Sequence, residues 1–454
     1  MLRVARPLLT CGRRSISTTS AEVGRLLDRY PVDRLGPQPG DEAVLTLSGG
    51  VDSSVAAFLA IERGGLKPVR TIFMRNWNSL DEAQTFEPGA GGSTGCTWLR
   101  DWRLVERTAR VLGLKAELMD LSTEYWNQVF APALDDWQRG TTPNPDVACN
   151  REIKFGELLL RAGLAESFPS LTSNASPSAS PGPRRWLVTG HYARLAYHRG
   201  TGDSTVLGSL HRASDATKDQ SYFLSAVAAD KLGRAHFPLA NLTKAEVRSI
   251  AAHVGLPTAA SEESMGLCFV GERGTRGHAR FLASYIDARP GNIVSLDGRT
   301  VGRHEGLHTL TVGQGARIGG ASTRWFVAKK KPETNEIVVV PGADHPLLRC
   351  RSLHIDAFLP ISARGSLVES LRGSDGQQRP RLLAQIRHRQ AAVACTVARL
   401  PPSTPGDDDD DAQPAVEVAF DEPVVGVAQG QTCALYDGDE CLGSGVISHV
   451  SLAE

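Results

Sequence analysis

The sequence of 454 residues lacks any apolar run long enough to cross a bilayer, so no membrane association is expected. It also lacks an excess of either charge, since 50 Lys and Arg residues balance 50 Asp and Glu residues. A nucleic-acid partner must therefore be held by local patches. The eight cysteines form no Cys-x-x-Cys pair, which argues against a zinc ribbon or a disulfide scaffold. We predict no metal ligands and a reducing compartment, leaving open whether a metal cluster binds near two of the thiols.

Acidic residues are missing from the beginning of the chain, where none precedes Glu22. The same segment carries Arg3, Arg6, Arg13 and Arg14 together with several Ser and Thr residues. This composition is typical of a mitochondrial presequence, and a disordered basic tail is the alternative. We predict that residues 1–20 direct the protein to the mitochondrial matrix.

The chain is organised around the stretch LTLSGGVDSS at residues 45–54. Strand-forming residues precede it at 43–47 and helix-forming residues follow at 55–61. Glycines and hydroxyls between a strand and a helix N-terminus form an anion cradle suited to phosphate. A Walker A loop is excluded because no Gly-Lys-Ser/Thr follows. The Ser-Gly-Gly-x-Asp-Ser string resembles the loop of the PP-loop ATP pyrophosphatases, which cleave ATP between its α and β phosphates.

Apolar periodicity predicts strands over 69–74, 115–121 and 186–189, and helices over 101–112, 244–254 and 277–286. Strand and helix alternate, which predicts an α/β domain with a doubly wound parallel sheet over residues 38–278. Residues 78–95 are expected to form a polar loop, and the Ser- and Pro-rich residues 167–185 a disordered insertion. From residue 292 short β-type runs dominate, typical of an all-β barrel or sandwich. We predict a small central domain over 279–345 and a C-terminal β domain over 346–454, in which the acidic residues 407–411 form a solvated loop.

Two cysteines lie in settings that bear on chemistry. In TTPNPDVACNREIKF (141–155), Asn144 is expected to cap a helix that begins with Pro145, which places Asp146 and Cys149 on one helix face. Asp146 would oppose a thiolate beside it, so we interpret it as a proton acceptor or donor. Cys268, in the apolar run MGLCFVGE, is by itself more typical of a buried structural thiol.

Further motifs favour a reactive role for Cys268 over a structural one. They are, in this order, TGHYAR, TKDQSYFL, GLCFVGER and YDGDECLGSGVI. With the PP-loop and the 141–155 segment, they resemble the tRNA-specific 2-thiouridylase family over residues 43–450, and the basic N-terminus resembles its mitochondrial form. The resemblance implies that ATP, with Mg²⁺, adenylates the carbonyl oxygen on carbon 2 of the wobble uracil in tRNA. Cys268 would then carry a persulfide received from a donor such as a cysteine desulfurase or relay protein, Cys149 would become its disulfide partner, and Asp146 would act as acid or base.

The resemblance also implies the binding residues. ATP would contact Ser48, Gly49, Gly50, Val51, Asp52, Ser53, Met74 and Gly190. The tRNA would contact Asn144, Pro145, Asp146, His191, Lys218, Asp219, Gln220, Arg387, His388 and Gln431. Alternation in the 379–389 segment predicts that Arg387 and Arg389 share one strand face, and a merely solvated face is the alternative.

Some positions depart from the family pattern. His388 stands where a tyrosine is usual, and Gly315 follows Gln314 where an arginine is common. Two other functions stay open. A PP-loop ligase, similar to lysidine synthetase or argininosuccinate synthetase, would not require Cys149 and Cys268. A non-catalytic RNA-binding protein would release no pyrophosphate in response to tRNA.

Overall fold

The computed structural model describes residues 19–77, 97–164, 183–200, 205–261, 281–287, 289–320, 323–362, 380–401 and 413–453. The predicted loop at 78–95, most of the insertion at 167–185, Cys268 and the acidic residues 407–411 lie outside these ranges. The first helix, α1 (Ser20–Leu27), begins inside the segment predicted as a presequence. Thr19 caps α1 and forms a reciprocal capping box with Glu22, so the folded part of the chain includes residue 19.

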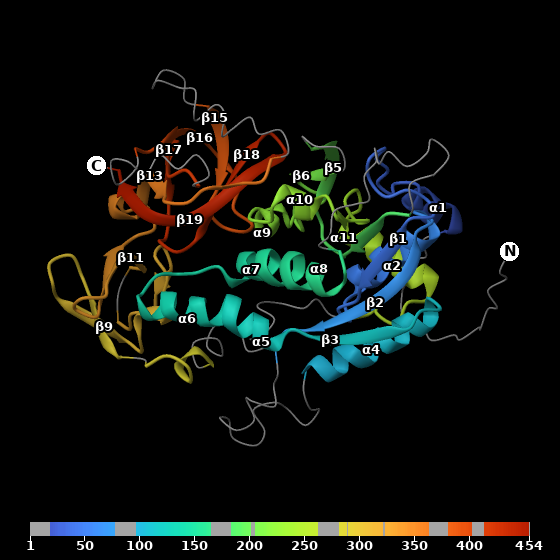
Figure 1. Ribbon diagram of the computed structural model, residues 1–454. Helices are drawn as coiled ribbons and strands as arrows, with labels where there is room; N and C mark the ends of the chain where they lie inside the picture. The colour runs from blue at the N-terminus through green and yellow to red at the C-terminus, as the bar shows by residue number, and fades with distance from the viewer. Residues whose placement is uncertain are drawn as a thin grey trace.

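Five parallel strands form the first sheet in the order β3-β2-β1-β4-β7. They are β1 (Glu42–Thr46), β2 (Lys67–Arg75), β3 (Ala116–Asp120), β4 (Arg185–Val188) and β7 (Ala235–His236). Successive residues of β1 face opposite layers, with Ala43 and Leu45 against α2 (Val51–Glu62) and α4 (Thr97–Val111). Val44 packs in a separate core cluster with residues of the helices that lie between β3 and β4 in the chain. Figure 1 shows these helices next to the sheet. The predicted doubly wound parallel sheet is confirmed.

The layer on the Val44 side is built from helical pieces between β3 and β4. They are α5 (Ser122–Tyr125), α6 (Ala131–Gln138), α7 (Pro145–Ala148) and α8 (Leu158–Arg161), with π-helical segments at Trp126–Phe130 and Cys149–Glu157. The sequence pattern did not indicate the π turns. The predicted helix at 244–254 is α11 (Lys244–Val254), which packs on α1 and α2. Among the described helices, none is long and apolar enough to span a membrane.

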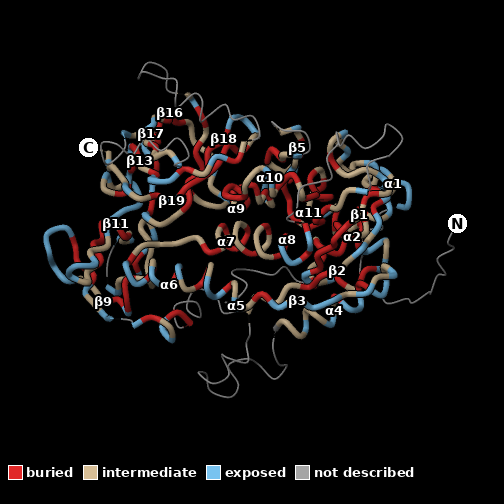
Figure 2. The backbone as a smooth tube through the Cα atoms, viewed as in Figure 1, coloured by how far each residue is buried: buried red, intermediate tan, exposed pale blue. Residues whose placement is uncertain are grey.

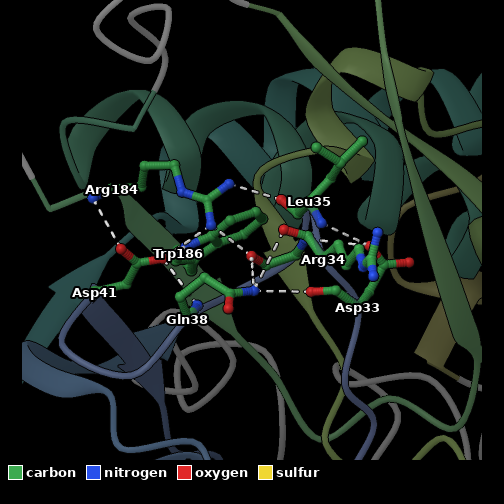
Figure 3. A network of polar contacts seen from close by, with 8 residues as sticks. Asp33, Arg34, Leu35, Gln38, Asp41, Arg184 and Trp186 are labelled. Atoms are coloured by element: carbon green, nitrogen blue, oxygen red, sulfur yellow. Dashed lines mark hydrogen bonds and ion pairs between the residues drawn. The ribbon is translucent and has the colours of Figure 1, made fainter. Parts of the chain in front are cut away.

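A buried network of polar contacts connects residues 33–41, which precede β1, to the amino-terminal end of β4 (Figure 3). Asp41 is buried, and its carboxylate accepts hydrogen bonds from Trp186 Nε1 at 2.9 Å and from Arg184 Nη2 at 3.2 Å. The Arg184 guanidinium also donates to the Leu35 carbonyl at 2.6 Å and lies over the Trp186 ring. This end of the sheet is thereby sealed, while the loops at the carboxyl ends of the strands stay available for a site.

The central sheet has the order β10-β11-β12-β8-β9. Its strands are β8 (Gly291–Val294), β9 (Thr300–His304), β10 (Gly315–Ala316), β11 (Trp325–Lys331) and β12 (Glu336–Pro341). Val327, Ile337 and Val339 are fully buried and form its core. The predicted small central domain is therefore a β domain.

The C-terminal strands close into a barrel, because β13 pairs with both β17 and β19. The strands are β13 (Arg349–Ile355), β15 (Arg381–Gln385), β16 (Val393–Arg399), β17 (Val416–Val425), β18 (Thr432–Asp437) and β19 (Glu440–Leu452), with the short β14 (Leu359–Pro360) beside β19. The predicted C-terminal barrel is confirmed.

A hairpin from the first domain, β5 (Arg194–Arg199) and β6 (Val206–His211), extends the barrel sheet. Its link is the pairing of β6 with β19 at Cys441 and Leu210. Buried residues consequently run continuously from the first domain into the barrel (Figure 2). The sequence did not predict this shared sheet.

Candidate active site

The loop after β1 forms an open cradle at the start of α2. Gly50 is the helix N-cap and Gly49 has a φ of 82°, a conformation that favours glycine. Ser53 Oγ accepts from the Ser48 amide at 3.0 Å and donates to the Gly50 carbonyl at 3.1 Å, which fixes the loop. A Cβ atom at Gly50 would approach only Ser48 Oγ, at 3.3 Å, so the space in front of the helix start is open. The first amides of α2 have no intrahelical acceptor and can bind phosphate oxygens there.

Two other predicted ATP residues lie against this cradle. A Cβ atom at Gly190 would lie 2.6 Å from the Ser53 amide nitrogen, so the chain after β4 can pass the first turn of α2 only because residue 190 is glycine. Met74 lies near the carboxyl end of β2, two residues beyond Ile72, which pairs with Thr46. The structure therefore brings Met74 and Gly190 to the two sides of the loop.

The side chains of Val51 and Asp52 form contacts outside the cradle. Val51 is 3% exposed and packs in the core between α1, α2 and α11. The Asp52 carboxylate accepts from Lys244 Nζ at 2.6 and 2.7 Å and from the Tyr192 hydroxyl at 2.8 Å. These two residues can contribute backbone amides to the cradle, while the Asp52 carboxylate anchors α2 to α11.

The predicted cap of the 141–155 segment is confirmed, because Asn144 Oδ1 accepts from the Val147 amide at 3.4 Å and Pro145 begins α7. Cys149 is 4% exposed and starts the π-helical segment that follows. Burial raises the pKa of the Asp146 carboxyl, and the positive charge of Lys154 opposes this rise. A carboxyl group with a raised pKa beside a cysteine is suited to proton transfer.

A chain of buried hydrogen bonds connects this helix to the segment after β4. The His191 ring lies 2.7 Å from Thr189 Oγ1 through Nδ1 and 3.2 Å from Asn150 Oδ1 through Nε2. Asn150 Nδ2 in turn donates to the Asp146 carbonyl at 2.9 Å. His191 is 8% exposed, and burial followed by the charge of Lys154 lowers the pKa of its imidazole well below the ordinary value.

His191, a predicted tRNA contact, is engaged within the protein, and its contact with tRNA stays a prediction. Both nitrogens of its neutral ring are already engaged, and the ring packs against Phe155 and Phe237. The imidazole thereby connects the segment after β4 to the helix of Asp146 and Cys149. Residues 189–192 contact α2 through Gly190 and Tyr192. Through His191 they contact the helix that carries Asp146 and Cys149, formed by α7 and the π-helical segment after it and called the thiol helix below. The predicted ATP residues and the predicted thiol residues therefore lie next to the same segment.

Comparison with known proteins identifies the family of this chain. The family model described as "tRNA methyl transferase HUP domain" matches residues 41–272, "tRNA methyl transferase PRC-barrel domain" matches 279–341, and "Aminomethyltransferase beta-barrel domain" matches 366–447. The tRNA-specific 2-thiouridylase MnmA of Thiobacillus denitrificans is 38% identical over 410 residues, covering 89% of this chain and 98% of the relative. The chain belongs to the tRNA-specific 2-thiouridylase family. The MnmA proteins of Psychrobacter sp. and Ralstonia pickettii are 36% and 37% identical, covering 95% and 89% of this chain and 99% and 95% of their own lengths.

In this thiouridylase-family chain the barrel packs directly on the segment before the thiol helix. Gln431 Nε2 donates to the carbonyls of Thr142 at 2.8 Å and Pro143 at 3.3 Å. The Tyr222 hydroxyl donates to the Thr432 carbonyl at 2.9 Å and lies 3.4 Å from Asn144 Nδ2. Gln431 and Asn144 thus hold the barrel and the thiol helix together through their side chains.

The predicted tRNA residues 218–220 and 388 also meet at the junction between the first domain and the barrel. Asp219 is buried, and its carboxylate accepts from Arg212 Nη1 at 3.2 Å and Ser221 Oγ at 2.7 Å. Gln220 exchanges two hydrogen bonds with the Tyr192 backbone, at 2.8 and 2.9 Å. The half-buried His388 ring packs 4.3 Å from Phe223, and Lys218 is partly exposed beside it. The side chains of Asp219 and Gln220 therefore form hydrogen bonds within the protein and stabilise the turn at residues 218–220.

The predicted strand face of Arg387 and Arg389 is wrong. β15 ends at Gln385, and Arg389 has a φ of 68° in the following turn, which breaks the alternation. Arg387 Nη2 donates to the Val312 carbonyl at 2.7 Å and to the Gly426 carbonyl, so this guanidinium joins the central domain to the barrel. Arg389 is exposed.

Sequence reasoning missed several residues of the site, namely Asn150, Lys154, Tyr192, Tyr222 and Lys244. A signal existed for Asn150 and Lys154, which belong to the CNREIKF string, but their contacts depend on a π turn. Lys244 begins a helix with a visible Thr243–Glu246 capping box, yet its pairing with Asp52 joins residues far apart in sequence. Within the described ranges no three His, Cys, Asp or Glu side chains are grouped as a metal site requires.

Proposed function

We propose that this protein uses ATP to replace the oxygen on carbon 2 of the wobble uridine of tRNA with sulfur. The observation that carries the proposal is the contact of residues 189–192 with both the PP-loop helix and the helix of Asp146 and Cys149. An activating site for ATP and a thiol site for sulfur are thereby adjacent. The relatives are named for 2-thiouridylase activity on tRNA, which supports this reading.

The proposed reaction has two steps. The uracil carbonyl oxygen attacks the α phosphorus of ATP, pyrophosphate leaves through the cradle at Gly50, and an O-adenylate remains on the base. Cys268 holds a persulfide, and the Cys149 thiolate attacks its inner sulfur. A Cys149–Cys268 disulfide forms, sulfide is released and attacks carbon 2, and AMP leaves. A reductant must then cleave the disulfide, and a persulfide donor must reload Cys268.

The residues around the cradle fit the nucleotide. Open space in front of Gly50 and the amides at the start of α2 suit phosphate oxygens. Asp101, whose Cα and Cβ atoms would lie 3.0 Å from a Cβ at Gly49, could hold the Mg²⁺ that accompanies ATP, because Asp52 is engaged by Lys244.

The test measures pyrophosphate release and 2-thiouridine, by mass spectrometry of the wobble nucleoside, with tRNA, ATP and a persulfide donor. Gly50→Val should abolish pyrophosphate release, since its side chain fills the cradle while its φ of −86° suits valine. Cys149→Ser and Cys268→Ser should each abolish thiolation but keep pyrophosphate release. Cys395→Ala, in the barrel core, is the matched control and should keep both. Thiolation in either serine variant would refute the sulfur route. Pyrophosphate release that needs neither thiol and is never accompanied by 2-thiouridine, even in the wild-type protein, would favour a PP-loop ligase.

We further propose that the protein acts in the mitochondrial matrix and that its N-terminal segment is a presequence. The capping of α1 by Thr19 indicates where to truncate, because removing residues 1–18 spares the capping box. This truncation should keep activity and abolish import of a tagged protein. Unchanged import of the truncated protein would refute the proposal.

A further inference from the structure

The helix α4 carries a row of arginines on the face opposite the one that packs on the sheet. Val105 and Ala109 are buried, at 0% and 2% exposure, and fix the inner face of the helix. Arg100, Arg103, Arg107 and Arg110 are all exposed. At about 100° per residue, these four side chains fall within an arc of about 80° centred opposite Val105.

The row is uniform in charge. The acidic residues of α4, Asp101 and Glu106, lie outside the arc of the arginines. In the part of the chain that the structure describes, no ion pair is formed by Arg103, Arg107 or Arg110, and Arg100 lies 3.9 Å from Asp101. Neighbouring like charges on a helix repel one another, so helix stability does not account for this row.

The row begins next to the candidate nucleotide site. The backbone of Asp101 packs so closely on the PP-loop that a Cβ atom at Gly49 would lie 3.0 Å from its Cα. From Arg100 to Arg110 the row extends about 15 Å along the helix axis. Figure 1 shows α4 along the outer edge of the molecule beside β3. The chain as a whole has zero net charge, so this row is a local concentration of positive charge.

We propose that the arginine row of α4 binds the phosphate backbone of tRNA. Arginines in a row suit successive phosphates, and contacts of this kind position a nucleic acid without reading its sequence. The proposal rests on the proposed function, because it adds a surface that positions the same tRNA substrate. An acidic protein partner is the alternative, and it would be favoured if loss of the arginines left tRNA binding unchanged.

The experiment measures tRNA affinity against salt concentration for the full chain. The variant Arg103→Gln/Arg107→Gln/Arg110→Gln should bind at least about tenfold more weakly, with the slope of log affinity against log salt reduced by about 2 to 3. The loss should be the same for a tRNA without a wobble uridine, since phosphates carry no sequence. Pyrophosphate release at saturating tRNA should stay at the wild-type level.

Two matched controls separate charge from fold. The corresponding triple lysine variant keeps the charges and should keep the salt slope, while Arg349→Gln/Arg351→Gln removes exposed arginines of β13 and should have no effect. Wild-type affinity and slope in the glutamine variant would overturn the inference and leave the proposed function intact. Failure of the wild-type chain to bind tRNA at all would overturn both.

Discussion

The Nε2 atom of His191 lies 3.2 Å from the Oδ1 atom of Asn150, and this contact joins the segment after β4 to the helix of Asp146 and Cys149. Asn150 also donates a hydrogen bond from Nδ2 to the Asp146 carbonyl, so His191 is connected to Asp146 through Asn150. The two parts of the site are therefore held in register by a neutral, buried pair of side chains.

The first prediction concerns this pair. Asn150→Leu and His191→Leu should each lower the thiolation rate at saturating tRNA by about 10²-fold, because a shift of about 1 Å in a reacting group has such an effect. The tRNA dissociation constant should stay unchanged, as measured by a binding titration. A weaker tRNA affinity with a normal rate at saturation would instead establish His191 as the tRNA contact expected from the sequence.

The second prediction concerns Lys154, whose positive charge lowers the raised pKa of Asp146. Lys154→Met should raise the pKa of Asp146 further. If Asp146 acts as the base, the acidic limb of the thiolation rate should move to higher pH, with recovery at high pH. Lys154→Arg keeps the charge and should retain the wild-type profile. An equal loss of rate at every pH would show that Lys154 acts in another way.

The third prediction concerns Arg387, for which a structural role can be tested against the predicted tRNA contact. Arg387→Ala removes donors to two carbonyls that join the central domain and the barrel, so the free energy of unfolding should fall by about 2–3 kcal/mol. Urea denaturation measures this change. Arg389→Ala, in the exposed turn, is the control and should change it little. A normal stability for Arg387→Ala together with a flatter salt dependence of tRNA binding would restore the phosphate contact.

The fourth prediction concerns pH and stability. Burial lowers the pKa of His236 to about 3 from 6.5, and its Nε2 atom lies 2.6 Å from the Tyr30 hydroxyl. Below pH 6.5 the unfolded chain binds a proton that the folded chain does not, so stability is present above this pH and is lost as pH falls. His236 should contribute about 1.4 kcal/mol per pH unit between about pH 6 and pH 4. Urea denaturation of His236→Asn across this range should show a slope smaller by this amount, and an unchanged slope would contradict the assignment.

The sequence by itself determined the local features of this protein. Glycines between a strand and a helix predicted the cradle at residues 48–53, and Asn144 before Pro145 predicted the cap of the thiol helix, because both depend on neighbouring residues. The alternation of strand-forming and helix-forming segments along the chain likewise predicted the parallel sheet. Motif order indicated the family, which the comparisons confirmed.

Only the tertiary structure decided which side chains face the site and which hold the domains together. Asp52 forms its hydrogen bond with Lys244, His191 with Asn150, and Arg387 with the Val312 carbonyl, and the two partners of each bond are far apart in the sequence. The turn at Arg389 and the hairpin that joins the barrel also depend on partners that no local pattern reveals. A motif constrains the kind of residue at a position, but its hydrogen-bond partner is set by the packing of distant segments, and that packing decides whether a polar side chain serves the substrate or the fold.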